Sequence, residues 1–275
     1  MAGQKNAKKS QSIDAKNQNK GGFILAGDWV KLCPSDRAGG EMVIEKIKER
    51  KNRFIRPAIA NIDQLFIVIA SYPQPDLKMV DKLIVNGLSQ NIDPIICLNK
   101  SDINSPDFVN QISAQYKHRK IVHLSGQDGQ IDAMIPLIKN KLTALCGQSA
   151  VGKSTIINAI LGNSARKTQG LSQIGRGKNT TTDTQLFSVF GGLVADTPGF
   201  SLADTIGVDH NDLDLFYPEF ASYLGKCKYH RCNHLSEPDC AVTAAVSAKK
   251  INKERFDRYQ EIFKQIKEKR DSVFK

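Results

Sequence analysis

The segment "GQSAVGKS", from Gly147 to Ser154, restricts the possible folds of this chain more than any other stretch. It matches the pattern G-x-x-x-x-G-K-[ST] in full, with the apolar run "LTALC" before it and the helix-like run "TIINAILG" after it. This pattern is a phosphate-binding loop when a strand precedes it and a helix follows it. A glycine-rich turn with a chance lysine would not need that context. The sequence therefore predicts an α/β fold in which this loop ends a strand of a parallel, helix-covered sheet.

The residue types in this loop suit a nucleoside triphosphate and Mg²⁺. The glycines allow backbone N–H groups to turn toward the phosphates, and the N-terminus of the following helix adds a positive partial charge. Lys153 is expected to neutralise the β- and γ-phosphates, which makes it a candidate catalytic residue, and the Ser154 hydroxyl is expected to bind Mg²⁺. The predicted phosphate-binding residues are Gly147, Gln148, Ser149, Ala150, Val151, Gly152, Lys153, Ser154 and Thr155.

The segment "CLNKSD" contains the pattern N-K-x-D, which indicates guanine recognition. Guanine presents two adjacent N–H donors that the carboxylate of Asp102 can accept, whereas adenine has no such pair, which argues against a P-loop ATPase. Asn99 is expected to bridge toward the phosphate loop, and the stem of Lys100 is expected to cover the base. Farther along, Ser125 and Gly126 match a short loop whose backbone contacts the guanine oxygen. Taken alone, the tetrapeptide N-K-S-D could be an ordinary Asn/Asp turn after a strand.

Two further segments are typical of the switch regions of GTPases. Asp196 begins "DTPG" after an apolar run and is expected to hold Mg²⁺ through water, while the N–H of Gly199 would sense the γ-phosphate. Thr181, with Thr180 as the alternative, lies in a glycine- and threonine-rich stretch and is the predicted Mg²⁺-binding threonine and a candidate catalytic residue. Alone, these segments could be a common turn and a solvated loop. Their position after a phosphate loop favours the switch interpretation.

The order of these motifs along the chain is base box, base loop, phosphate loop, switch threonines and D-x-x-G. In an ordinary GTPase the phosphate loop comes first. Joining the last helix of such a domain to its first strand, and opening it after D-x-x-G, produces the order seen here. Domain termini tend to lie near each other at the surface, so this rearrangement can preserve the sheet. The sequence therefore predicts a circularly permuted GTPase domain.

The regions on either side of this core differ from it in composition. Residues 1–22 carry five lysines against one aspartate, and we expect a basic disordered tail there. Residues 23–50 are predicted to form a small two-stranded β module, 51–205 the permuted GTPase domain and 206–275 a helical domain. Within the core, strands are expected near 64–70, 94–100, 120–126 and 142–147, helices near 76–90, 106–117 and 131–140, and a strand pair after 185.

Cys227, Cys232, His234 and Cys240 crowd into the C-terminal region. Three thiolates and one imidazole form a closed tetrahedral zinc set, which is structural because no position is left open for chemistry. His230 is the possible substitute ligand, and a set of reduced cysteines without metal is the alternative. The nearby basic residues would suit phosphate contact, and the charged final helix could face RNA or only solvent.

Charge and hydropathy restrict the partners and the location. The formal net charge of +11 fits a polyanionic partner, although a merely soluble basic surface fits as well. The N-terminus has no apolar core of a secretory signal, and no apolar window reaches the roughly 18 residues of a membrane span. We therefore expect a cytoplasmic protein with no membrane contact.

At this level the chain resembles the RsgA/YjeQ type of circularly permuted GTPases. The resemblance rests on "RKNRFIRPAIANIDQ", "CLNKSD", "GQSAVGKSTIINAILG", "GRGKNTTTDTQLF", "DTPGF" and the cysteine cluster, and it covers roughly residues 28–270. It implies an OB-like barrel before the GTPase core, a C-terminal zinc domain and one zinc per chain. It also implies GTP binding and Mg²⁺-dependent hydrolysis to GDP, stimulated by the small (30S) ribosomal subunit and its rRNA, in late maturation of that subunit. We expect a monomer.

The chain departs from the pattern of that family at two places. The OB-like module looks truncated, because about twenty polar residues stand where the family has several strands. Asn179 stands where the family usually has a water-positioning histidine. Phe200 follows D-x-x-G where many GTPases carry a catalytic glutamine, and an apolar residue there is typical of the family. Asn179 is therefore the third candidate catalytic residue. These departures motivate an alternative function, a nucleotide-gated rRNA-binding scaffold with negligible turnover.

Overall fold

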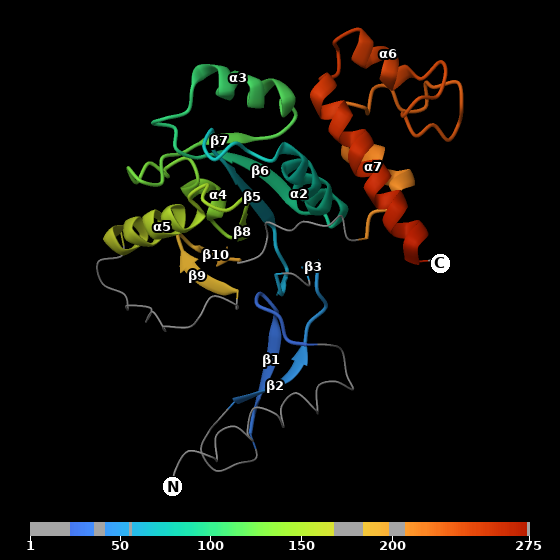
Figure 1. The fold of residues 1–275 in the computed structure, drawn as a ribbon. Helices are drawn as coiled ribbons and strands as arrows, with labels where there is room; N and C mark the ends of the chain where they lie inside the picture. Colours follow the sequence, from blue (N-terminus) through green and yellow to red (C-terminus); the bar gives the residue numbers. More distant parts are fainter. Residues whose placement is uncertain (1–22, 36–41, 55–56, 168–183, 198–206, 274–275) are drawn as a thin grey trace.

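The computed structural model describes residues 23–35, 42–54, 57–167, 184–197 and 207–273 (Figure 1). Its centre is a six-stranded sheet in the order β7-β6-β5-β8-β10-β9. Five strands run parallel, and β9 pairs antiparallel with β10 at one edge. Their bounds are β5 Gln64–Ile69, β6 Asp93–Leu98, β7 Ile121–His123, β8 Leu142–Cys146, β9 Gln185–Val189 and β10 Gly192–Asp196.

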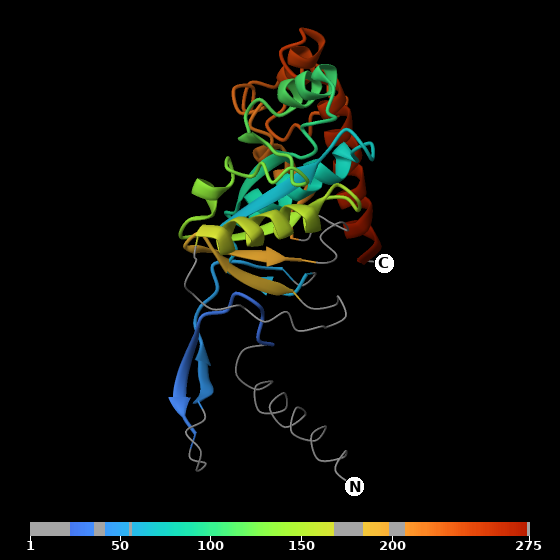
Figure 2. The same cartoon turned by 90° about the vertical axis from the view of Figure 1, so that its left-hand side faces the viewer.

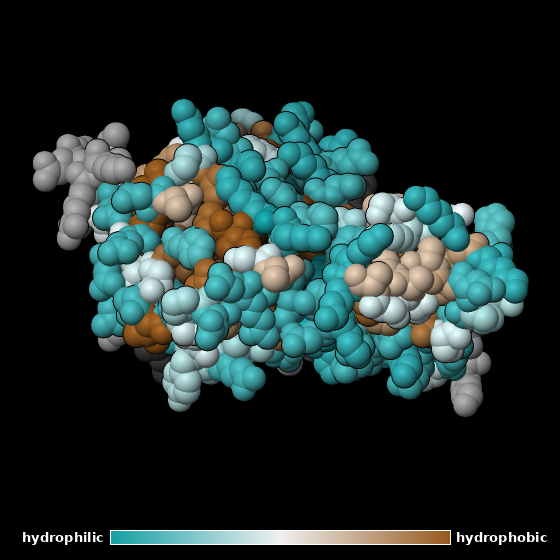
Figure 3. All heavy atoms as spheres, turned by 90° about the horizontal axis from the view of Figure 1, so that it is seen from above, coloured by the Kyte–Doolittle hydropathy of each residue, from teal (hydrophilic) through white to brown (hydrophobic). Residues whose placement is uncertain are grey.

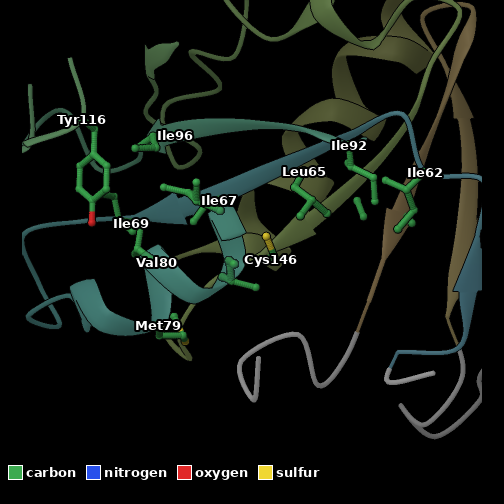
Figure 4. Close-up of a cluster of buried hydrophobic side chains, with 14 of the residues drawn as sticks. Ile62, Leu65, Ile67, Ile69, Met79, Val80, Ile92, Ile96, Tyr116 and Cys146 are labelled. Atoms are coloured by element: carbon green, nitrogen blue, oxygen red, sulfur yellow. The ribbon is translucent and has the colours of Figure 1, made fainter. Parts of the chain in front are cut away.

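Successive side chains of the central strand β5 point to opposite faces of the sheet, and both faces are covered. Leu65, Ile67 and Ile69 pack with α2 (Leu77–Ser89) and with Ile112 of α3 (Pro106–Gln115). Phe66 and Val68 pack with the other layer, which includes α5 (Lys153–Lys167) and α4 (Ile135–Ile138). Figure 4 shows the first of these layers, with Tyr116 of the α3 side above Ile69. Burial on both faces explains why this strand reads as an unbroken apolar run.

Local signals in the sequence fix the starts of two helices. Asp76 accepts a hydrogen bond from the Met79 N–H (3.0 Å) and caps α2. Ser105 accepts from the Phe108 N–H (3.2 Å) and caps α3, with Pro106 in its first turn. Both helices lie where the sequence predicted them.

The predicted helix at 131–140 is wrong, because α4 spans only Ile135–Ile138. Pro136 has no N–H to donate, so a helix can start there but cannot run through it. Met134 N–H instead bonds to Ile131 O in a turn. Asn140, with φ of 59°, ends the segment after the helix.

Two β ribbons precede the sheet, β1 (Val30–Pro34) with β2 (Met42–Ile47) and β3 (Arg53–Phe54) with β4 (Ile59–Ala60). The β1–β2 ribbon projects away from the sheet (Figure 2). The predicted boundary between residues 50 and 51 stays a prediction. Hydrogen bonds cross it, since Ala60 N–H bonds to Ala26 O (2.8 Å) and Asn61 Nδ2 to Gly27 O (2.9 Å). The predicted tail at 1–22 lies outside the described residues.

The C-terminal region builds a second core on one side of the sheet. It contains the 3₁₀ helix η1 (His210–Phe216), α6 (Ala241–Ser247) and the long α7 (Lys253–Val273). Aromatic rings fill it, with Tyr259 meeting Tyr217 and Phe220 edge-on at centroid separations of 5.0 Å. Val85 of α2 is buried in the same core, so α2 contributes to both.

A buried ion cluster joins α2 to α7. The carboxylate of Asp81 is fully buried and meets Arg255 Nη1 at 3.2 Å and Arg258 Nε at 2.5 Å. Arg255 also pairs with Glu219 and lies over the ring of Tyr116, 4.5 Å from its centroid. Burial alone would lower the pKa of Arg255, but the surrounding acids, Asp81 first, raise it overall, so this guanidinium stays charged.

Within the described residues, no helix combines the length and the apolar character needed to span a bilayer. Figure 3 shows mostly hydrophilic side chains, with smaller hydrophobic areas among them, on the face seen from above.

The Asp81 cluster generates a stability prediction. Replacing Asp81 with Ala leaves two guanidinium groups without their shared buried partner, and we expect the free energy of unfolding to fall by about 3–5 kcal/mol. Urea titration followed by far-UV circular dichroism measures it. The matched control is Glu261→Ala, which breaks the exposed Lys78–Glu261 pair between the same two helices and should cost no more than about 1 kcal/mol. If both variants lose the same free energy of unfolding, the buried cluster does not contribute more to stability than the exposed pair, and the prediction is wrong.

Candidate nucleotide and metal sites

The predicted nucleotide motifs that the structure describes lie at one edge of the sheet. Asn99 directly follows β6, Gly147 follows β8, Asp196 ends β10 and Ser125 comes two residues after β7. These four strands are parallel, so their carboxyl ends meet at the same edge. Ligands of open α/β sheets bind at that edge. The structure therefore gathers motifs that are dispersed over about a hundred residues of sequence.

Two positions of the phosphate loop require glycine, because other parts of the chain approach their Cα atoms too closely to leave room for a side chain. Gly147 has φ of +137°, and a Cβ there would lie 2.3 Å from the carbonyl oxygen of Val68 on the neighbouring strand. Gly152 has φ of +96°, and a Cβ there would lie 2.3 Å from Nδ2 of Asn99. Any larger residue at either position would separate the loop from the base box or from β5.

Lys153 lies in the first turn of α5 and points back over the loop. Its Nζ donates to the carbonyl oxygens of Gly147 (2.8 Å) and Gln148 (2.7 Å). Burial lowers the pKa of Lys153, and the nearby Cys146 and Asp196 oppose that shift. Burial likewise raises the pKa of Asp196, which Lys153 opposes. A phosphate beside Lys153 and a cation beside Asp196 would each stabilise the charged form, so these residues fit a magnesium nucleotide.

Asn99 joins three of the motifs through one side chain that is only 2% exposed. Its Nδ2 donates to the carbonyl oxygen of Val151 in the phosphate loop (2.8 Å). Its Oδ1 accepts from the backbone N–H of Gly126 in the base loop (3.0 Å). The sequence predicted the first contact and not the second.

Lys100 has a positive φ of 58° and also reaches the phosphate loop. Its Nζ donates to the carbonyl oxygens of Ala150 (3.1 Å) and Tyr72 (2.8 Å). The side chain is thereby stretched between the phosphate loop and the segment that follows β5. That placement suits a stem that covers a base plane.

Asp102 is exposed at the open side of the base box, where its carboxylate is accessible to a ligand. One of its oxygens lies 3.2 Å from the Ser125 hydroxyl, while Oδ2 of Asp128 lies 2.6 Å from the same hydroxyl. A hydroxyl has a single proton to donate, so the two carboxylates compete for it. Asp128 was missed by the sequence interpretation, because nothing in "SGQDG" distinguishes it from a loop residue.

Three polar residues of the predicted phosphate-binding set are exposed to solvent. Ser149, Ser154 and Thr155 are exposed at the loop and at the start of α5. Thr197, which the sequence did not single out, is 1% exposed and donates to Leu145 O (2.8 Å), which ties the D-x-x-G segment to β8. Asn179, Thr180, Thr181, Gly199 and Phe200 lie outside the described residues, so their roles stay predictions.

An open pocket of about 400 Å³ lies between α5 and the base loop. Gly126 and Thr155 belong to its lining and were predicted to contact nucleotide. The other lining residues were not predicted from the sequence: Gln127, Asp128, Gly129, Asn158, Ala159, Gly162 and Asn163.

The predicted zinc ligands converge in the C-terminal domain. The ligand atoms of Cys227, Cys232, His234 and Cys240 all lie within 4.8 Å of one another. Sγ of Cys227 is 3.8 Å from Sγ of Cys240, and Nδ1 of His234 is 3.6 Å and 3.3 Å from these two sulfurs. A tetrahedral zinc ion with bonds of about 2.3 Å to sulfur and about 2.0 Å to nitrogen needs separations of about 3.8 Å between sulfurs and about 3.5 Å between sulfur and nitrogen. The donor set therefore fits zinc.

The orientation of His234 is fixed by a carboxylate that the sequence did not reveal. Its Nε2 lies 3.2 Å from Oδ2 of Asp214 on η1, so Nε2–H can donate there while Nδ1 faces the sulfurs. Such a partner selects the tautomer of a metal-binding imidazole. Asp214 lies 20 residues before His234, so only the fold brings the two together.

A phosphate loop, a base box and a D-x-x-G segment that follow parallel strands of one sheet, in permuted order, define a circularly permuted GTPase. A family model described as RsgA GTPase matches residues 47–206. The chain belongs to the RsgA GTPase family. A second model, described as 50S ribosome-binding GTPase, matches residues 142–271, a range that begins at β8. An unpermuted GTPase begins with the phosphate-loop strand, which explains why this second match starts there.

Relatives of known name support the same family. The small ribosomal subunit biogenesis GTPase RsgA of Ruminiclostridium cellulolyticum is 35% identical over 258 residues, covering 89% of this chain and 85% of that protein. The protein of the same name from Moorella thermoacetica is 38% identical over 242 residues, covering 86% and 82%.

Two solved structures have the same overall arrangement. YjeQ from Thermotoga maritima superposes with a TM-score of 0.77 at 30% identity, covering 91% of this chain and 87% of that one. YloQ, described as a circularly permuted GTPase, gives 0.74 at 31% identity, covering 92% and 84%. The predictions of a circularly permuted GTPase fold and of the family are confirmed.

The geometry of the cysteine cluster predicts how zinc is retained. Cys240→Ser should abolish stoichiometric zinc, and Asp214→Ala should weaken zinc binding about 10- to 100-fold by releasing His234. Zinc content after dialysis against a graded chelator measures both. Cys33→Ser removes a thiol far from the cluster and should retain the zinc of the parent. Full retention in Cys240→Ser would contradict the site.

Proposed function

We propose that this protein binds GTP and hydrolyses it to GDP and phosphate, and that it acts in the biogenesis of the small ribosomal subunit. The observation that carries the nucleotide assignment is the Asn99 side chain, which ties the guanine box to the phosphate loop and to the base loop. The names of the RsgA relatives support the ribosomal assignment. The subunit and its rRNA are the proposed partners, with the protein acting as a monomer in the cytoplasm.

The proposed roles follow from where the side chains lie. Asp102 accepts the two adjacent N–H groups of guanine from its exposed position. Ser125 and Gly126 form the loop proposed to face the guanine oxygen, and Asn99 holds that loop in place by accepting the Gly126 N–H. Lys153 exchanges its loop carbonyls for the phosphates, which are the stronger partners of an ammonium group. Ser154, Thr181 and Asp196 are the groups that would hold Mg²⁺. When bound, that ion neutralises charge on the β- and γ-phosphates.

The C-terminal cysteines and His234 are proposed to hold one structural zinc. The four ligand atoms leave no open coordination position, so this metal shapes the domain and takes no part in hydrolysis. The domain boundaries at residues 22, 50 and 205 belong to the same proposal. The D-x-x-G segment leads directly into this domain, which would place the nucleotide state and the docking surface on one stretch of chain.

A second candidate function is a nucleotide-gated rRNA scaffold with negligible turnover. Asn179 and the shortened OB-like module motivate it, because Asn179 replaces the water-positioning histidine that is usual in the family. Both functions need the same base and phosphate contacts, so they differ only in turnover.

The base box gives the first test. Asp102→Asn should weaken GTP binding by about 10- to 100-fold and improve binding of xanthosine triphosphate, because the new amide can donate to the additional xanthine oxygen. Equilibrium binding of both nucleotides at fixed Mg²⁺ measures the exchange of preference. Asp107→Asn, on the exposed first turn of α3, is the control and should change neither affinity. An unchanged GTP affinity in Asp102→Asn would refute the guanine assignment.

Turnover separates the two candidate functions. We expect slow multiple-turnover phosphate release from GTP that increases on addition of purified small ribosomal subunits. Asn179→Ala should lower the stimulated rate and Asn179→His should maintain or raise it, with GTP affinity little changed, because this position serves to align water. No release with or without subunits, together with tight GTP binding, would support the scaffold instead.

A further inference from the structure

Asn104 lies two residues beyond the base box and joins two backbone segments through its side chain. Its Nδ2 donates to the carbonyl oxygen of Asn99 (2.9 Å). Its Oδ1 accepts from the N–H of Ser71, just after β5 (3.0 Å). Its own N–H donates to Lys100 O (3.1 Å), which closes the turn that contains the box. The first residue of the box is thereby tied to the neighbouring strand end.

The turn that Asn104 closes is one that needs external support. Lys100 sits in the left-handed region with φ of 58°, which is strained for a residue with a side chain. Lys100 reaches the same segment as Asn104, since Nζ donates to Tyr72 O while Oδ1 of Asn104 holds Ser71 N–H. Residues 71 and 72 are therefore the anchor of the box, and Asn104 is the side chain that fixes its start to this anchor.

We propose that Asn104 is a positioning residue for guanine recognition. By holding the carbonyl of Asn99 and closing the turn at Lys100, it fixes the orientation in which Asp102 meets the base. It acts through these neighbours and makes no contact with nucleotide. The inference rests on the proposed guanine site, and it concerns discrimination between bases more than binding of phosphates.

If Asn104 had only a structural role, its removal would lower stability without changing the preference for guanine. Asn52 is a matched control for that case. Asn52 also joins two backbone groups with its side chain, since Nδ2 donates to Ile62 O (2.8 Å) and Oδ1 accepts from Ile62 N–H (2.9 Å). Asn52 lies just before β3 and Ile62 lies just before β5, so this pair is at the start of β5, away from the base box. Removing Asn52 deletes the same two kinds of hydrogen bond, so it reports their cost to stability alone.

The test compares the binding of GDP and of inosine diphosphate to the full chain and its variants. Inosine lacks the exocyclic amine of guanine, so the ratio of the two affinities reports how well Asp102 is aligned. In Asn104→Ala we expect GDP affinity to fall about tenfold and the GDP preference over inosine diphosphate to shrink several-fold. Asn104→Asp keeps the acceptor for Ser71 and loses the donor to Asn99, and it should give an intermediate ratio. Asn52→Ala should keep the parental ratio, with a comparable loss of melting temperature.

The outcomes distinguish this inference from the proposed function. A parental GDP preference in both Asn104 variants, or a loss of preference in Asn52→Ala equal to theirs, would overturn the positioning role and leave the guanine site intact. If Asn104→Ala does not fold, the ratio in Asn104→Asp decides. If the parent itself does not prefer GDP, the guanine site is wrong and this inference falls with it.

Discussion

The nucleotide site depends on the two hydrogen bonds of the buried Asn99 side chain. They connect the end of β6 with the phosphate loop after β8 and with the base loop after β7. Leaving one partner of a buried amide unsatisfied costs about 1–3 kcal/mol, so each of the three loops stabilises the positions of the other two. Gly152 belongs to the same constraint, because any Cβ there would collide with the Asn99 amide. The position of the Asn99 side chain in the base box thus requires a glycine at position 152 of the phosphate loop.

The parts of the structure that the sequence could predict are those governed by local rules. Mostly apolar runs predicted β5 and β8, and the caps Asp76 and Ser105 mark where α2 and α3 begin. The convergence of the three cysteines and His234 was equally predictable, because these residues lie within 14 residues of chain. The helix predicted at 131–140 is wrong because its apolar spacing hid the effect of Pro136.

The remaining features depend on contacts between distant segments and have no local signal. Asp214 beside His234 and Asn104 beside Ser71 are ordinary polar residues in the sequence. Asp128 is only three residues from Ser125, but an acid at that spacing in a loop carries no signal of its own. Asp81 is a similar case. On the buried face of an amphipathic helix a single acid would be destabilising, and only the structure shows that Arg255 and Arg258 of α7 pair with it. Their roles come from the sheet order and from the packing of α7 on α2, which composition and periodicity do not specify.

The permuted order of the strands also determines the sequence of events during synthesis. Chains are made from the N-terminus, and elements can associate only once they exist. β5, β6 and the base box are complete by residue 102, whereas the carbonyl of Val151 that Asn99 requires is added about fifty residues later. β8, which pairs with the free edge of β5, is likewise made after β6 and β7, the two strands on the other side of β5. During synthesis the base box is therefore present before the phosphate loop. A nucleotide can be bound through both its base and its phosphates only after β8 has paired with β5.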